Sequence, residues 1–237
     1  MGYTRNQIEE MCRSAMACPH TFYCEKFVNY RGKTTDTGEY YTEVVAQFVS
    51  DNMKSFLRGI VTITRESNYR IDTHDGVFDP DSVREEEITA MKLFNACKSG
   101  DMIAHIGTII DYQTPLKSKR TDDAGKVDLL ACDGNYLRLL ELKKEASDET
   151  MLRCVLEGFT YLWTVDEEKL LQDFDLPVHT VVKACPFVFA GSVQHREYRE
   201  ERPWLKKLMA QLDSVPFFLR ETSEGYRVLS EEEANED

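Results

Sequence analysis

The stretch GKVDLLACDGNYLRLLELKKE, residues 125–145, decides the fold of this chain. Two runs rich in leucine, 126–132 and 136–144, lie on either side of the pair Asp133-Gly134. An Asp-Gly pair between two such runs is one of the strongest short signals of a β-hairpin with a two-residue turn. The stretch therefore predicts two adjoining antiparallel strands.

The expected turn sets the register of the hairpin and gathers polar side chains on one face. It would place Asp128 opposite Leu139. Because side chains alternate along a strand, Asp128, Glu141 and Lys143 then share a face, with the two acids as diagonal neighbours about 7–8 Å apart. One Mg²⁺ can bind two carboxylates across such a gap. Lys143, one pleat further along, could orient or deprotonate a water molecule beside the ion, as hydrolysis of a phosphodiester requires.

The elements expected around the hairpin predict an α/β fold. Helical spacing of apolar residues is found in 4–18 and 39–58, and a run rich in β-branched residues in 59–71 predicts a strand. From Ser82 onward, with Ser82 and Glu85 as an expected capping box, the order is helix, three strands, helix, strand, helix and closing hairpin. The later elements are expected at 82–99, 102–114, 126–132, 136–144, 147–165, 178–190, 204–212 and 215–229. This order is typical of a sandwich around a mixed sheet.

The chain divides into three parts on the same evidence. Residues 1–81 form an N-terminal portion with helices and a strand, whose role the sequence does not reveal. Residues 82–230 form the core that contains the hairpin. Residues 231–237, EEEANED, are expected to be an acidic disordered tail.

The spacing of Asp128 from Glu141-Leu142-Lys143, on adjoining strands that follow a helix and a strand, resembles the PD-(D/E)XK superfamily of restriction-enzyme-like nucleases over residues 82–192. The resemblance implies a restriction-endonuclease-like α/β/α sandwich around a mixed sheet, here with an N-terminal helical extension. In that family the aspartate and the glutamate bind Mg²⁺ or Mn²⁺, and the lysine assists the attacking water. It implies a metal-dependent nuclease, with DNA as the expected substrate and a homodimer as an expected assembly.

Further residues are candidates on the same resemblance. An acid on the preceding helix often joins the site. Glu86 and Glu87 could both face the sheet, whereas Glu85 serves better as a cap; of the two we prefer Glu87. RecB-type members carry Gln-x-x-x-Tyr on the helix after the lysine, and this chain has Glu157 in place of the glutamine and Tyr161 in place of the tyrosine. The proline that commonly precedes the aspartate is replaced by Val127.

The charge balance bears on the partner. The net charge of −13 argues against non-specific coating of nucleic acid, which depends on lysine and arginine. Five of the acids lie in residues 231–237, however, and residues 104–145 contain seven acidic and seven basic side chains. An alternative of another class therefore stays open, a catalytically inactive module of nuclease fold that binds protein or nucleic acid.

The remaining signals point to an ordinary cytoplasmic protein. No apolar run is long enough for a membrane helix, and the N-terminus does not have the pattern of a secretory signal. The seven cysteines do not have the spacing of a disulfide framework or a zinc site, and we interpret them as reduced thiols. No cysteine–histidine pairing supports a cysteine nucleophile.

Overall fold

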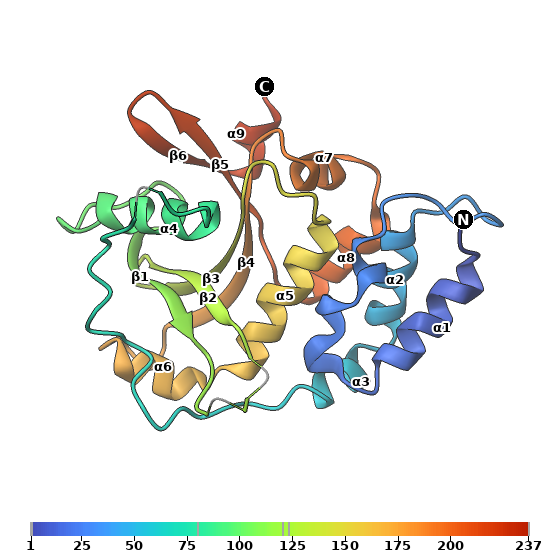
Figure 1. Ribbon diagram of the computed structural model, residues 1–237, viewed down its shortest axis with the longest axis horizontal. Coiled ribbons are helices and arrows are strands. Elements are labelled where there is room, and N and C mark those ends of the chain that lie inside the picture. The colour runs from blue at the N-terminus through green and yellow to red at the C-terminus, as the bar shows by residue number, and fades with distance from the viewer. Residues whose placement is uncertain (1, 80, 120, 123, 237) are drawn as a thin grey trace.

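A six-stranded mixed β-sheet lies at the centre of the computed structural model, which describes residues 2–79, 81–119, 121–122 and 124–236 (Figure 1). The strands follow one another across the sheet in chain order: β1 Thr108–Pro115, β2 Lys126–Cys132, β3 Tyr136–Lys143, β4 Val181–Phe189, β5 Phe217–Thr222 and β6 Gly225–Leu229. Strands β1 to β3 are antiparallel, β3 to β5 run parallel, and β6 returns antiparallel to β5. The expected α/β class with a mixed sheet is confirmed.

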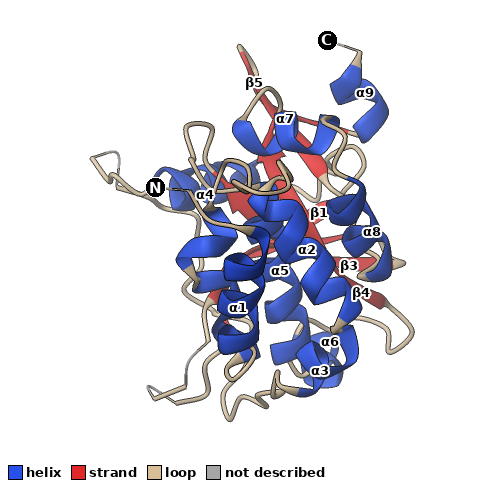
Figure 2. Ribbon diagram, turned by 90° about the vertical axis from the view of Figure 1, so that its right-hand side faces the viewer, coloured by secondary structure: helices blue, strands red, loops and turns tan. Residues whose placement is uncertain are grey.

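Helices cover both faces of this sheet (Figures 1 and 2). Helix α4, Glu85–Ala96, contacts β1, β2 and β3, and α5, Met151–Thr164, contacts β3 and β4 from the other side. The two faces of β3 follow from its alternation: Leu140 and Leu142 belong to the core cluster under α4, whereas Leu139 belongs to a cluster with α5. Glu141 and Lys143 follow the phase of Leu139, so they lie on the α5 side of the sheet. The other helices of the C-terminal half are α6 Glu167–Asp173, α7 Val193–Arg199, α8 Pro203–Gln211 and α9 Glu231–Asn235.

The N-terminal portion is helical and packs against the far side of α5 (Figure 2). It contains α1 Arg5–Ala15, the 3₁₀ helices η1 Pro19–Cys24 and η2 Lys26–Asn29, α2 Tyr41–Asp51 and α3 Met53–Arg58. Its apolar side chains share one core cluster with those of α5 and α8, so packing is continuous across the expected boundary between residues 81 and 82.

The strand expected at residues 59–71 is a wrong prediction. This segment has a single isolated bridge, from Ile63 to Val165, and side chains fix the rest of it. Arg65 is buried and donates to the carbonyls of Pro115 and Lys117, at 3.1 and 2.6 Å. β-Branched composition was outweighed by these contacts.

Two helix starts and the C-terminal tail also differ from expectation. Helix α4 begins at Glu85 with Arg84 as its N-cap, so Ser82 does not cap it. Helix α5 begins after Thr150, whose side chain accepts from the N–H of Arg153. The acidic tail, expected to be disordered, contains α9, which begins with a capping box.

The hairpin forms, but its register differs from the predicted one. Leu130, not Asp128, pairs with Leu139, because the side chain of Asp133 accepts the N–H groups of Asn135 and Tyr136 and lengthens the loop. The shift of two residues leaves every side chain on its predicted face. Asp128 and Glu141 lie one residue beyond the last pair of this register, Leu129 and Leu140.

Of the helices in the described part of the chain, none combines the length and the apolar character that a membrane span requires.

Candidate active site

A polar cavity of about 500 Å³ lies between α4, the start of β2, the end of β3 and one side of α5. Its lining brings together most of the residues that the sequence singled out. They are Glu86, Lys126, Asp128, Glu141, Lys143, Lys144, Ala146, Ser147, Asp148, Glu149, Arg153, Glu157 and Tyr161.

Asp128 lies where β2 and β3 separate. The strand pairing ends at Leu129 and Leu140, and beyond it the N–H of Leu142 donates to Asp128 Oδ2 at 2.9 Å. On the other side Gln113 Nε2 of β1 donates to Oδ1, also at 2.9 Å. Burial raises the pKa of Asp128 to about 7, against the opposing effect of Lys143.

Lys143 lies at the centre of a group of glutamates. Its Nζ is 2.7 Å from Glu141 Oε1, 2.7 Å from Glu157 Oε2 and 3.1 Å from Glu149 Oε2. The side chains of Glu141 and Lys143 are only 5% and 7% exposed. One buried ammonium therefore faces three carboxylates, an arrangement that carries excess negative charge out of water.

The pKa values of Glu141 and Glu157 shift in opposite directions. Burial raises the pKa of Glu141 well above its ordinary value, and the neighbouring charge of Glu157 adds to the effect. Burial would raise the pKa of Glu157 too, but the contact with Lys143 outweighs it and lowers that pKa. Although burial opposes it, the surrounding carboxylates raise the pKa of Lys143 well above its ordinary value, so this side chain is an ammonium in the free protein.

Tyr161 closes the buried end of the cavity. Its hydroxyl donates to Glu157 Oε1 at 3.0 Å and lies 3.4 Å from the hydroxyl of Tyr23 in η1. Burial raises its pKa, with the charges of Glu141 and Glu157 adding to the effect. Tyr161 thus acts as a neutral donor that fixes one oxygen of Glu157.

Two glycines allow α5 to come so close to the sheet. A Cβ atom on Gly158 would lie 3.3 Å from the Cβ of Glu141. One on Gly125 would lie 2.2 Å from the hydroxyl of Tyr161. The close approach is what brings Glu157 within reach of Lys143.

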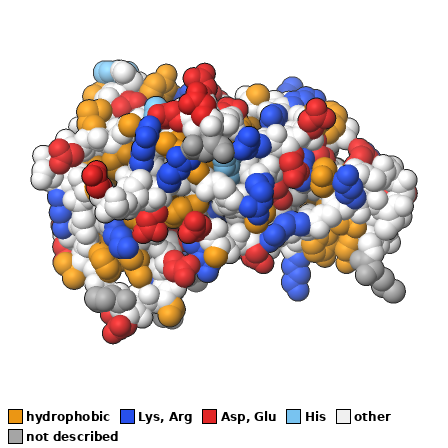
Figure 3. Space-filling model, turned by 90° about the horizontal axis from the view of Figure 1, so that it is seen from above, with side chains coloured by type: hydrophobic (Ala, Val, Ile, Leu, Met, Phe, Trp, Pro, Cys, Tyr) orange, Lys and Arg blue, Asp and Glu red, His pale blue; other side chains and the backbone are white. Residues whose placement is uncertain are grey.

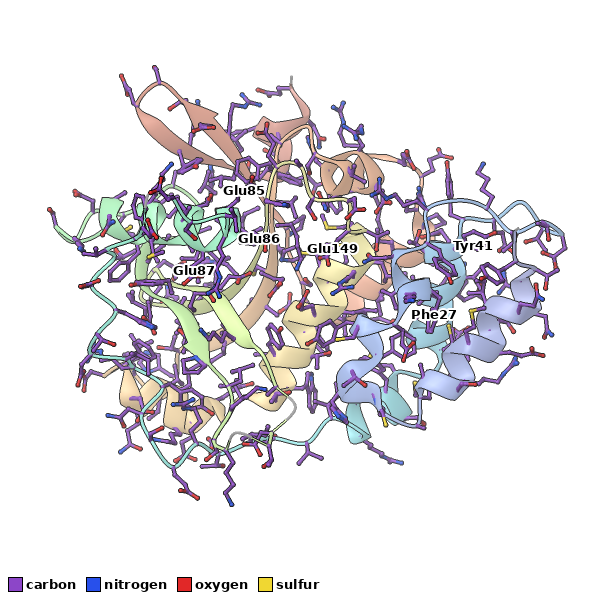
Figure 4. The ribbon with its side chains drawn as sticks, in the orientation of Figure 1. Phe27, Tyr41, Glu85, Glu86, Glu87 and Glu149 are labelled. Atoms are coloured by element: carbon purple, nitrogen blue, oxygen red, sulfur yellow. The ribbon has the colours of Figure 1, made fainter. Side chains whose placement is uncertain are left out.

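The acids of α4 separate into one that lines the cavity and two that do not (Figure 4). Glu86 Oε1 accepts the N–H of Lys144 at 3.0 Å, at the edge of the cavity. Glu87 pairs instead with Arg84 at 3.1 Å, and Glu85 lies 3.5 Å from Lys144 Nζ at the surface. The geometry thus favours Glu86 over Glu87, the reverse of the preference drawn from the sequence.

Two residues of the site were not predicted. Gln113 holds Asp128 from a strand position with a φ of 50°, beside a register irregularity in β1, and no local sequence pattern marks it. Glu149 precedes α5 in a loop and reaches Lys143 and Arg153, the latter at 3.0 Å. The i,i+4 spacing of Glu149 and Arg153 was the one signal in the sequence that could have pointed to this acid.

The donor set fits a divalent cation, with one rearrangement. The buried Oε2 of Glu141 accepts no hydrogen bond from the described residues, although the carboxyl groups of Glu141 and Glu157 can share a hydrogen bond when one of them carries a proton. Each oxygen of Asp128 accepts one of the two hydrogen bonds described above and has a second lone pair. Carboxylate oxygens are the ligands that Mg²⁺ and Mn²⁺ prefer. Within the described ranges, however, no three acidic, histidine or cysteine side chains converge in the geometry of a filled metal site. The ammonium of Lys143 lies between the glutamates, so it would have to withdraw from Glu141.

The arrangement brings buried carboxylates and one ammonium together in a polar cavity. Comparisons of the chain with protein-family models, with curated proteins and with solved structures find no match.

Proposed function

We propose that this protein is a metal-dependent nuclease that hydrolyses phosphodiester bonds of nucleic acid. The observation that carries the proposal is the buried Glu141, whose Oε2 accepts no hydrogen bond from the described residues, next to Asp128 and to a lysine that three carboxylates surround. A buried acceptor without a partner is costly, and evolution retains such a cost most readily where a ligand removes it. The order from α4 to β4, a helix, three strands, two helices and a strand, contains the helix–three strands–helix–strand series of a restriction-endonuclease-like arrangement, with α6 in addition, and so supports that arrangement for the same segment.

Each residue then has a role that its position suggests. Asp128 and Glu141 would hold Mg²⁺ or Mn²⁺, and Gln113 and the N–H of Leu142 keep the Asp128 carboxylate in place. The bound ion would stabilise negative charge on the phosphoryl oxygens and make a water molecule more acidic. Lys143 donates to the attacking water or to a phosphoryl oxygen, while Glu157 and Glu149 retain its ammonium near the reacting atoms.

A nuclease assay tests the proposal. Labelled single- and double-stranded DNA and RNA are incubated with the protein in Mg²⁺, in Mn²⁺ and in EDTA. We expect cleavage with either ion and none in EDTA, and a loss of at least about 100-fold in Lys143→Ala. Because Lys143→Ala alters a buried cluster, Asp128→Asn serves as a second variant, and Lys54→Ala on the exposed surface of α3 is the control. Absence of cleavage by the wild type, or cleavage at the wild-type rate by both site variants, would refute the mechanism.

A binding module without catalysis is the second candidate, and one observation favours it. Lys143 already compensates part of the charge of the three glutamates without any ion. If the wild type binds nucleic acid yet cleaves none of the four substrates with either ion, this alternative replaces the nuclease. DNA as substrate and a homodimeric assembly rest on the family resemblance, and the same assay with DNA and RNA, together with light scattering, tests them.

A further inference from the structure

A second cavity, of about 540 Å³, adjoins the candidate active site at the carboxyl ends of the parallel strands β3 and β4. Residues 145–148 after β3 and residues 190–193 after β4 form its walls, and Ala146, Ser147 and Asp148 line both cavities. In open α/β sheets, ligands bind outside the carboxyl ends of parallel strands. The position is therefore one where a ligand is expected, beside the proposed point of cleavage.

Two arginines from distant parts of the chain flank this second cavity. Arg196 Nη1 of α7 donates to the carbonyl of Gly191 at 2.6 Å, and Arg31 Nη2 donates to the carbonyl of Asp148. A carbonyl fixes a guanidinium without neutralising it. Each guanidinium has five donors, so both retain donors for an anion.

The two acids that line the cavity compensate these charges only weakly, although the buried Glu197 of α7 also interacts electrostatically with Arg31. The carboxylate of Asp148 is 94% exposed and 3.8 Å from Arg31, and Glu145 is exposed. Exposed pairs of this kind contribute little, because water and salt screen them. Figure 3, which looks onto the face that carries these loops, shows Lys and Arg side chains along the middle of the face, with acidic side chains among them.

Arg31 belongs to the N-terminal portion, which hydrogen bonds join to the start of α5. Thr150, the N-cap of α5, donates through its hydroxyl to the carbonyl of Val28 at 2.9 Å and through its N–H to Asn29 Oδ1 at 3.0 Å. These bonds fix the chain two residues before Arg31 relative to the loop after β3. The N-terminal portion thus supplies one wall of the second cavity.

We infer that Arg31 and Arg196 form a subsite for a backbone phosphate of the nucleic-acid strand, next to the phosphate that is cleaved. The inference rests on the proposed function and gives residues 1–81 a role in substrate binding. The two cavities share residues 146–148. A strand with one phosphate at Glu141 and Lys143 would therefore pass these residues and place its neighbouring phosphate near the two guanidiniums. Arginine binds a phosphate through two parallel hydrogen bonds, which gives affinity without base preference.

The test measures binding of a fluorescent DNA oligonucleotide by anisotropy, in EDTA so that no metal-dependent cleavage occurs, over a series of salt concentrations. Arg31→Ala/Arg196→Ala is compared with Lys54→Ala/Arg58→Ala, which removes the same charge from α3 at the far end of the molecule (Figure 1). We expect the dissociation constant of the arginine variant to rise about tenfold per arginine. The slope of log K against log salt should fall by about 0.7 to 0.9 for each phosphate that the variant no longer binds. Arg31→Lys/Arg196→Lys keeps both charges and should show most of the wild-type salt dependence. Asp148→Asn should tighten binding of the oligonucleotide.

Cleavage in Mg²⁺ provides the second readout, with a raised KM and an unchanged kcat expected for the arginine variant. If the arginine and α3 variants bind alike, the subsite is refuted, whether or not the protein cleaves DNA. If the wild type binds through the two arginines but never cleaves, the nuclease proposal fails and the subsite stands. If the wild type neither binds nor cleaves, both fail.

Discussion

Glu43 and Glu141 are two buried glutamates with opposite surroundings. Glu43 of α2 is 7% exposed, and its two oxygens accept the N–H groups of Trp204 and Leu205 at the start of α8, both at 2.9 Å. Glu141 is 4% exposed, shares Lys143 with two other carboxylates, and has one oxygen without a partner among the described residues.

The difference separates a structural acid from a candidate ligand. Two N–H groups satisfy Glu43, and in return its carboxylate caps a helix that belongs to the core. Nothing in the described structure satisfies Glu141 to the same degree. Burial alone therefore does not distinguish the two acids; what makes Glu141 a candidate ligand is an oxygen that accepts no hydrogen bond from the described residues, in a cavity beside Asp128.

Of the substitutions that test this comparison, removal of Lys143 should change the free energy of unfolding most. Lys143→Met leaves three carboxylates around an apolar side chain and should lower the free energy of unfolding by about 3–5 kcal/mol at pH 8. Urea denaturation measures it, and Mg²⁺ or lower pH should restore part of the loss, because either compensates the carboxylates. Lys54→Met at the surface of α3 is the control and should change little. A loss equal to that of the control would mean that the glutamates do not depend on Lys143.

The same substitution at the two glutamates should act with opposite sign. Glu43→Gln turns an amide N–H₂ towards a backbone N–H of α8 and should cost about 1–3 kcal/mol. Glu141→Gln removes a buried charge with a raised pKa and should stabilise the protein by about 1 kcal/mol at pH 8 in EDTA. Thermal and urea denaturation of both variants measure these two changes in stability. Equal destabilisation would remove the distinction between the two sites.

The pH dependence of stability should sharpen the comparison at Asp128. Its pKa is about 7 in the folded protein and 3.8 ordinarily, so between these values the folded state binds the extra proton. Stability is then lost as pH rises from about 4 to about 7, the opposite of a salt-bridged acid. Asp128→Asn should remove this part of the pH dependence and be more stable than the wild type at pH 8 by about 1 kcal/mol. A wild type and variant with parallel pH profiles would contradict the account.

Much of the fold could be predicted because periodicity and turn chemistry act locally. The Asp133-Gly134 pair and its apolar flanks located β2 and β3, and the spacing of apolar residues located α5 and α8. The register was wrong because the Asp133 side chain bonds two backbone N–H groups of the loop, a contact that the dipeptide alone does not reveal. The segment around Arg65 was mispredicted since tertiary contacts fix it.

The candidate site was predictable only along single elements. Alternation placed Asp128, Glu141 and Lys143 on one face, and an error of two residues in register left that face unchanged. The choice between Glu86 and Glu87 depended on the rotation of α4 about its axis, which places Glu86 against the N–H of Lys144. Gln113 and Glu149 come from other elements, and only the folded chain brings them to the site.

Calorimetric titration with Mn²⁺ tests most directly the central claim that the buried carboxylate of Glu141 is a metal ligand. The titration compares the wild type, Glu141→Gln and Glu43→Gln at pH 8, where Asp128 is largely ionised. We predict saturable binding by the wild type and by Glu43→Gln, and its loss in Glu141→Gln. No binding by the wild type, or equal binding by Glu141→Gln, would contradict the claim.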